Sequence, residues 1–142
     1  MKILVPVDGS QNSMDALNVA IDYAKSKEAK ICLINVMPVI EDIDLEITAS
    51  ERVKIKESME KRAEYITQKA CGVLALENVM AICKAIVQSS SVPDAIVDFA
   101  EKEKTDLIII GSRGLNPSVR FRMGSVASKV VKHSPCSVYV VK

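Results

Sequence analysis

The stretch from Asp106 to Val130, "DLIIIGSRGLNPSVRFRMGSVASKV", decides the fold class of this chain. Its opening segment, 106–111, contains an unbroken apolar run of the kind found in strands that are buried on both faces of a sheet. Its closing segment, 125–132, places valines at helical spacing after a Gly-Ser pair. We therefore expect a strand, a glycine-rich connection and a helix, in that order. An isolated Gly-x-x-Gly usually makes a turn and no more, so the function of this connection depends on the rest of the chain.

Strand-like and helix-like segments alternate along the whole sequence. Besides 106–111, strands are expected at 2–7, 29–37, 79–87 and 137–142. Between them, apolar residues recur at the spacing of one helix face. Strands that alternate with helices imply a parallel sheet with helices on both faces, joined by right-handed crossovers. The sequence thus predicts an α/β protein in the order β-α-β-α-β-α-β-α-β.

The helices carry recognisable end signals. The segment 8–13, "DGSQNS", supplies turn and cap residues ahead of the first helix. Thr48 and Glu51 have capping-box spacing at the start of the second helix, and Gly72 is expected to end it. Pro93 fits the first turn of the third helix. The buried side of the second helix is expected to comprise Ile55, Met59, Ala63, Ile66 and Ala70.

Composition limits the class of protein. The 142 residues have the length of one domain, so 1–142 is expected to form a single unit. A net charge of +1 gives no electrostatic basis for binding nucleic acid or a membrane surface. No apolar run approaches the roughly 18 residues of a membrane span, and the start is too short for a signal peptide core. We therefore expect a cytoplasmic protein that binds neither nucleic acid nor membranes.

The cysteines are scattered, at Cys32, Cys71, Cys83 and Cys136, and His133 is the one histidine. None of the four forms a C-x-x-C pair, so the spacing of a zinc site is absent. In a cytoplasmic context we expect reduced, mostly buried thiols in place of a disulfide framework.

A ligand of such a sheet is expected at the carboxyl ends of the strands, where the strand order reverses. The candidate segments are 6–10 after the first strand, 36–38 after the second and 111–114 after the fourth. These three segments converge if the first and fourth strands are neighbours.

The glycines in the quoted stretch suit an anion. The sequence lacks G-x-x-x-x-G-K-[ST], and no G-x-G-x-x-G follows the first strand. Gly111 and Gly114 can adopt positive φ and let backbone N–H groups approach a phosphate. Gly124 and Ser125 open a helix, whose free N–H groups and dipole favour negative charge, and the Ser125 hydroxyl is expected to cap the helix or donate to a phosphate oxygen. Together, the switch-point location, the helix start and the second Gly-Ser pair favour a phosphate cradle over simple turns.

The spacing G-x2-G-x9-G-[S/T], read here as "GSRGLNPSVRFRMGSV", resembles the ATP-binding signature of the universal stress protein family. The stretches "ILVPVDGS", "DLIIIGSRG" and "SPCSVYVVK" are similar to other parts of that family's pattern, in the same order. The resemblance covers the whole chain. It implies a three-layer domain of the adenine-nucleotide α-hydrolase type, an open five-stranded parallel sheet of order 3-2-1-4-5.

The resemblance also implies a set of binding residues for ATP, or for ADP or AMP, with Mg²⁺ carried by the nucleotide. The adenosine part is expected at Pro6, Val7, Asp8 and Val36. The ribose and phosphates are expected at Gly111, Ser112, Arg113, Gly114, Gly124, Ser125 and Val126. Met123 stands where leucine is more usual in the family, and binding should survive because methionine fills apolar space flexibly.

Two assignments within this set stay open. Asp8 either contacts the nucleoside or a nucleotide-bound Mg²⁺, or it forms an Asx-turn before the first helix. Arg113, Arg120 and Arg122 can approach the phosphates, although we favour a solvated position for Arg120 and Arg122.

The resulting hypothesis is an ATP-binding stress-response module that acts as a regulator or sensor. The sequence offers no clear general base for a water nucleophile, so any ATP hydrolysis should be slow. One alternative is a pure interaction module, which ranks lower because the glycine motif is intact. A weaker alternative is an AMP-forming enzyme, since "VDGSQNS" holds one glycine where such enzymes carry a glycine-rich loop. We also expect a homodimer formed through the strand 137–141, because the implied strand order makes it an apolar edge.

Overall fold

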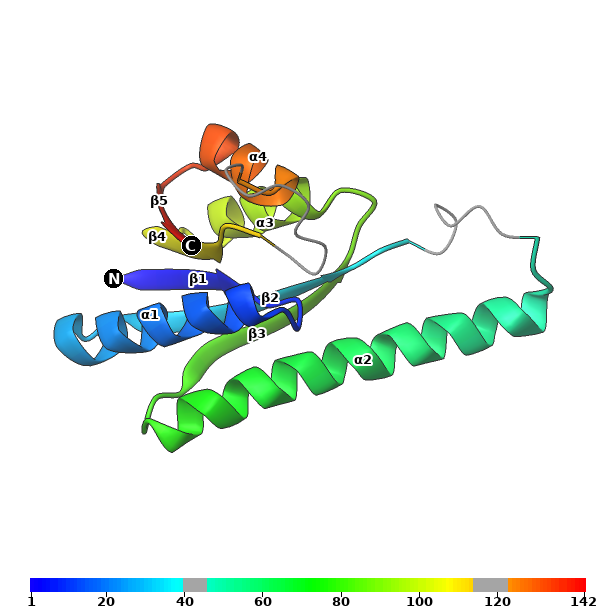
Figure 1. The fold of residues 1–142 in the computed structure, drawn as a ribbon, viewed down its shortest axis with the longest axis horizontal. Coiled ribbons are helices and arrows are strands. Elements are labelled where there is room, and N and C mark those ends of the chain that lie inside the picture. The colour runs from blue at the N-terminus through cyan, green and yellow to red at the C-terminus, as the bar shows by residue number, and fades with distance from the viewer. Residues whose placement is uncertain (40–45, 114–122) are drawn as a thin grey trace.

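A computed structural model describes residues 1–39, 46–113 and 123–142 of the chain. Within these residues five strands form one sheet of order β3-β2-β1-β4-β5, and all neighbouring strands in it are parallel. The predicted fold class and strand order are therefore confirmed (Figure 1). The elements are β1 Lys2–Pro6, α1 Gln11–Lys27, β2 Lys30–Met37, α2 Ala49–Leu76, β3 Ala81–Gln88, α3 Val92–Lys102, β4 Leu107–Gly111, α4 Ser125–His133 and β5 Ser137–Val141.

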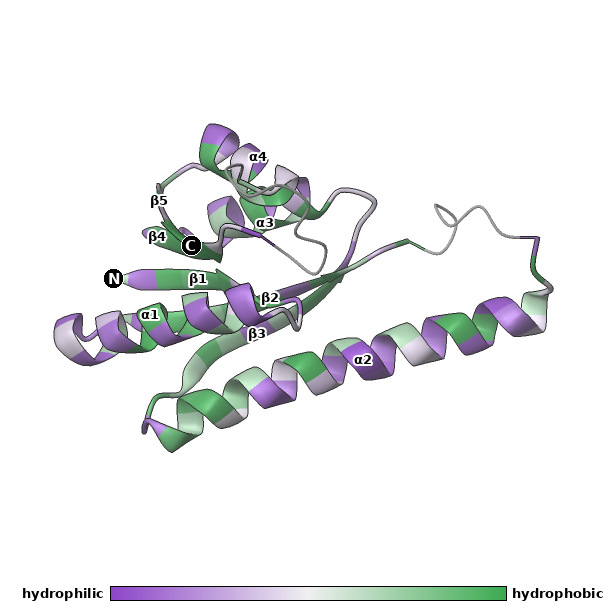
Figure 2. Cartoon of the chain, viewed as in Figure 1, coloured by the Kyte–Doolittle hydropathy of each residue, from purple (hydrophilic) through white to green (hydrophobic). Residues whose placement is uncertain are grey.

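The sheet separates two layers of helices. Side chains of α1 and α2 pack on one face of the sheet, and side chains of α3 and α4 pack on the other. Hydrophobic residues dominate the central strands, whereas the helices alternate hydrophobic and hydrophilic positions (Figure 2). Alternate residues of β1 serve the two cores: Ile3 and Val5 belong to the α1–α2 side, and Leu4 belongs to the α3–α4 side. Apolar residues at consecutive positions are therefore required in a strand that is covered on both faces.

The helix α2 begins as predicted but ends later. The capping box of Thr48 and Glu51 is present. The predicted stop at Gly72 is wrong, because the helix continues to Leu76. Shortly after the helix end, Asn78 adopts a positive φ of 57°. The Asn78 N–H donates to the Ala75 carbonyl at 3.0 Å, and the Val79 N–H donates to the Leu74 carbonyl at 2.9 Å. This is a Schellman end, in which asparagine takes the left-handed position that glycine usually fills.

The buried side of α2 also differs from the prediction. Ala63 and Ala70 are buried as expected, but Ile55, Met59 and Ile66 are half-buried. Figure 1 shows the N-terminal half of α2 extending past the end of the sheet, so its apolar side has little to pack against there. The fully buried positions, which lie toward the C-terminal half, are Ala63, Thr67, Ala70 and Leu74.

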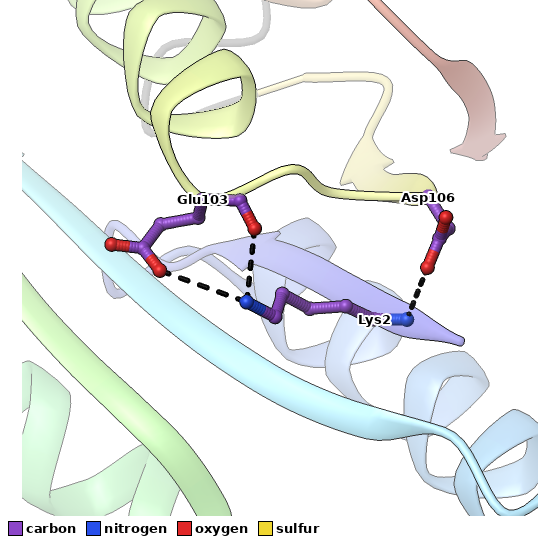
Figure 3. Close-up of polar contacts among 3 residues, drawn as sticks. All are labelled: Lys2, Glu103 and Asp106. Atoms are coloured by element: carbon purple, nitrogen blue, oxygen red, sulfur yellow. Dashed lines mark hydrogen bonds and ion pairs between the residues drawn. The ribbon is translucent and has the colours of Figure 1, made fainter.

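A polar cluster joins β1 to the α3–β4 connection at the amino end of the sheet (Figure 3). The Lys2 ammonium donates to the Glu103 carbonyl at 2.9 Å and lies 3.7 Å from its carboxylate, and the Lys2 backbone N–H donates to the Asp106 carboxylate at 2.7 Å. A partly exposed ion pair of this kind contributes about 0–1 kcal/mol to stability. In the parts of the chain that the structure describes, no helix combines the length and apolar character needed to cross a membrane.

Candidate functional site

The turn between β1 and α1 is built from side-chain hydrogen bonds. The Asp8 carboxylate accepts the Ser10 N–H at 2.8 Å, which makes the Asx-turn that the sequence left open for this residue. Ser10 in turn caps α1 by accepting the Ser13 N–H at 3.1 Å. Gly9 between them has a φ of +87°, a conformation that glycine adopts without a steric penalty. The turn therefore fixes Asp8 at the carboxyl end of β1.

Gly111 ends β4 and lies against the first turn of α1. A Cβ at this position would lie 2.8 Å from the Asn12 carbonyl oxygen, closer than real Cβ contacts occur. Gly111 does not adopt the positive φ that the sequence suggested for it. Among the described glycines, Gly9 is the one with a positive φ. Its missing side chain instead lets α1 approach the end of β4 closely.

The residues after Gly111 are bound to three neighbouring elements. The Ser112 N–H donates to the Val141 carbonyl of β5 at 2.7 Å, and the Ser112 carbonyl accepts the Gly124 N–H at 2.6 Å. The Arg113 N–H donates to the Asn12 side-chain oxygen at 3.0 Å. The start of α4 and the start of α1 are thereby held on either side of the Ser112–Arg113 backbone.

The helix α4 begins beside this backbone. Gly124 is the N-cap of this helix, and no side chain caps it. Ser125 is the first helical residue and therefore does not serve as the cap that the sequence suggested. The Gly124 N–H donates to the Ser112 carbonyl, so the expectation that this N–H is free for a phosphate is not met in the structure. By helix geometry, the N–H groups of Ser125, Val126 and Ala127 have no acceptor within the helix.

A pocket of about 460 Å³ lies at this edge of the sheet. Its size is in the range of small-molecule sites. Nine of the residues singled out from the sequence line it, and they come from β1 and the turn after it, β2, β4 and the two residues after it, and α4. They are Pro6, Val7, Asp8, Val36, Gly111, Ser112, Arg113, Ser125 and Val126.

Two of the described site residues predicted from the sequence, Met123 and Gly124, are not among the lining residues. Met123 is exposed, and Gly124 is connected to the pocket through its N–H bond to the lining residue Ser112. Gly114 lies outside the described residues, as do Arg120 and Arg122.

Sequence reasoning missed six lining residues. Val92 and Ile96 come from the start of α3, a helix that had been read only as a cover for the sheet. Its N-terminus follows β3 and so reaches the same edge as the other candidate segments, a signal that was available. The others are Ser13, Ile34, Ile110 and Ala127.

The pocket lining combines two kinds of chemistry. Aliphatic side chains of β2, β4 and α3 supply apolar surface on which a flat apolar group can pack. Asp8, Ser112, Arg113 and Ser125 contribute polar groups, and Ser125 is the first residue of α4. The Asn35 amide, which is buried, donates to the Val7 carbonyl at 2.7 Å and so holds the strand ends together behind the pocket. The arrangement suits a ligand with an apolar planar part and an anionic part.

The family model described as "Universal stress protein family" matches residues 1–142 of the chain. The chain belongs to the universal stress protein family. A universal stress protein of Methanocaldococcus jannaschii is 35% identical to it over 142 residues, covering 99% of this chain and 81% of that protein.

Solved structures of the family share the fold. The universal stress protein UspA from Lactobacillus plantarum superimposes with a TM-score of 0.83 at 25% identity, covering 100% of this chain and 97% of that one. A universal stress protein in complex with cAMP has a TM-score of 0.74 at 24% identity, covering 100% and 97%. Two others contain dAMP, from Archaeoglobus fulgidus (0.71, 23%, 100% and 98%), and AMP, from Arabidopsis thaliana (0.72, 18%, 100% and 91%).

Proposed function

We propose that this protein is a cytoplasmic, ATP-binding regulatory module of the stress response. The observation that carries the proposal is the pocket at the β1–β4 switch point, whose lining combines aliphatic and polar groups and includes the first turn of α4. Family members solved with cAMP, dAMP and AMP support an adenine nucleotide as the ligand class. These three ligands share the adenine ring and a phosphate on the sugar, which match the aliphatic and the polar lining residues respectively.

The pocket suggests how the nucleotide binds. The adenine ring would lie against Val36, Val92 and Ile96, since burial of its faces by aliphatic side chains is favourable. The phosphates would lie at the first turn of α4, where free N–H groups and the helix dipole favour negative charge. Asp8, at the β1 end of the same pocket, would face a Mg²⁺ ion carried by the phosphates.

Hydrolysis of the bound nucleotide is expected to be slow. Among the described lining residues Asp8 is the one carboxylate, and one of its oxygens already accepts the Ser10 N–H. No histidine or second carboxylate lies among them to activate a water molecule. The protein would therefore signal by holding a nucleotide, with ATP, ADP and AMP as the candidates.

The test is to denature the purified protein and identify any nucleotide that it releases. Release of ATP or ADP, together with a rise in melting temperature on adding ATP and Mg²⁺, is the expected result. An empty protein that shows no thermal shift would refute the proposal and favour an interaction module. Rapid conversion of ATP to AMP with a second substrate would favour an AMP-forming enzyme.

We further propose that the protein forms a homodimer through β5. This strand is an edge of the sheet, and its backbone groups on the free side are unpaired by any described strand. Tyr139 is 42% exposed there and stacks edge-to-face on Tyr23 of α1, with ring centroids 6.2 Å apart. Light scattering at micromolar concentration should give the mass of a dimer, and a monomeric mass would contradict the proposal.

Asn12 is expected to position the phosphate side of the pocket. Its side-chain oxygen accepts the Arg113 N–H at 3.0 Å, so Asn12→Ala removes a hydrogen bond of about 1 kcal/mol. We expect ATP affinity to fall about fivefold, while adenosine affinity changes less because adenosine lies mainly on the apolar side. Asn12→Asp keeps an acceptor and should retain adenosine binding.

Isothermal titration checks both ligands. Gln11→Ala is the control, because Gln11 is exposed and bonds to Asp15. Unchanged ATP affinity in Asn12→Ala would contradict this role.

A further inference from the structure

Two cysteines face each other across neighbouring strands. Cys32 of β2 and Cys83 of β3 are partners in the parallel register, and both belong to the core under α3 and α4. Neighbouring strands lie about 4.8 Å apart, within the Cα separation of about 4.4–6.8 Å that disulfides bridge. The pair therefore has the backbone spacing that a disulfide requires.

A bulge in β3 brings the two thiols to the same face of the sheet. The register pairs Ile31 with Ala81 and then Cys32 with Cys83, which leaves Ile82 without a partner. Residues two apart in a regular strand point the same way, yet Ala81 packs toward α1 and α2 whereas Cys83 packs toward α3 and α4. The extra residue thus turns Cys83 toward Cys32, as bulges commonly re-aim a side chain.

The two thiols differ in their access to solvent. Cys32 is 0% exposed, whereas Cys83 lies on the edge strand and is half-buried. The pKa of the Cys32 thiol is raised to about 12, mainly by burial and secondly by the neighbouring Cys83 thiol. Cys32 therefore stays protonated at neutral pH. The charges of Lys2 and Glu103 act on Cys32 in opposite directions. An oxidant from solvent therefore meets Cys83 first.

We propose that Cys32 and Cys83 form a peroxide-reactive dithiol that closes to a reversible disulfide between β2 and β3. In the first step the Cys83 sulfur attacks hydrogen peroxide, the O–O bond breaks, and Cys83 becomes a sulfenic acid with release of water. In the second step the Cys32 sulfur attacks the Cys83 sulfur, the S–S bond forms as the S–O bond breaks, and the hydroxyl leaves as water with the Cys32 proton. Two thiols lose two electrons in total, and the peroxide is reduced to two water molecules.

The register favours the second step although Cys32 is a weak nucleophile. The two sulfurs belong to neighbouring residues of one sheet, so their reaction is intramolecular and has a high effective concentration. The other thiols lack this geometry: Cys71 lies in α2, which packs on the opposite face of the sheet, and Cys136 lies beside β5 at the opposite edge. The inference is independent of nucleotide binding, because its readout is the oxidation state of the thiols.

The test uses the full chain with Cys71→Ser and Cys136→Ser, so that Cys32 and Cys83 are the remaining thiols. After treatment with hydrogen peroxide, the denatured protein should take up no alkylating reagent and should show the loss of two hydrogen atoms by mass spectrometry. A dithiol reductant should restore both alkylation sites. Peptide mapping should join the segment that contains Cys32 to the one that contains Cys83.

Single variants assign the two roles. In the same background, Cys32→Ala should leave Cys83 as a sulfenic acid that dimedone traps, whereas Cys83→Ala should leave Cys32 unmodified by the same treatment. The proposal is overturned if the parent protein keeps two alkylation sites after oxidation. It is also overturned if Cys83 is converted to a sulfinic acid without bonding to Cys32, or if the disulfide forms between two chains.

Discussion

Replacing Gly111 with alanine is expected to lower the free energy of unfolding by about 3 kcal/mol, the upper end of the usual cost of overpacking. The added Cβ would lie 2.8–2.9 Å from three atoms of Asn12, two of which are backbone atoms in the first turn of α1. Backbone cannot rotate away as a flexible side chain does, so α1 or the end of β4 must shift. Gly111→Val adds two further methyl groups and should cost more. Urea denaturation followed by circular dichroism measures both variants.

Gly72 provides the matched control for this prediction. A Cβ at Gly72 would meet nothing within 4 Å, and the residue lies in the interior of α2. Gly72→Ala should therefore stabilise the protein by about 0.5–1 kcal/mol, because alanine is the better helix former. A loss of stability in Gly111→Ala together with a gain in Gly72→Ala would distinguish an effect of close packing from an effect of helix propensity. Equal stability of Gly111→Ala and the wild type would show that α1 can move without cost.

The order of strands and helices could be predicted because each element is encoded in its own segment. The apolar run 107–110 indicates a strand covered on both faces, and Thr48 with Glu51 indicates a helix start. The strand order itself came from the family resemblance, since local patterns do not state which strands are neighbours. The end of α2 was missed for a related reason: Gly72 favours a stop locally, but Leu74 extends the helix because its side chain is buried in the core.

The glycines of the site required the structure. Their spacing assigned Gly111, Gly114 and Gly124 to contact with phosphate. In the structure Gly9 takes the positive φ within its local turn, Gly111 admits α1, and Gly124 donates its N–H to Ser112. The roles of Gly111 and Gly124 depend on elements distant in the sequence, so no local pattern could have separated them. The bulge that turns Cys83 toward Cys32 depends in the same way on pairing between strands.

Gly124 limits what side chain the start of α4 can carry. The sequence implies that valine at this position blocks the approach of the backbone to phosphate. In the structure the N-cap has a φ of −60° and a ψ of 158°, which any residue adopts, so the effect of a side chain is steric. A Cβ here would lie 3.1 Å from the Ser112 carbonyl oxygen and 3.5 Å from the Arg113 Cα. The start of α4 must therefore move away from the Ser112–Arg113 backbone to admit a branched side chain.

Gly124→Val is accordingly expected to reduce ATP affinity more than about 100-fold, a loss of about 2.8 kcal/mol, while the fold is retained. The free N–H groups of the first turn would leave the position at which they meet the phosphates, and the bond between Gly124 and Ser112, 2.6 Å in the wild type, would lengthen. Gly124→Ala adds one tight contact and should give an intermediate loss. Lys132→Ala, at the exposed far end of the same helix, is the control and should bind ATP normally. Isothermal titration at equal folded fraction, checked by circular dichroism, makes the comparison. Wild-type affinity in Gly124→Val would mean that the first turn of α4 does not hold the phosphates.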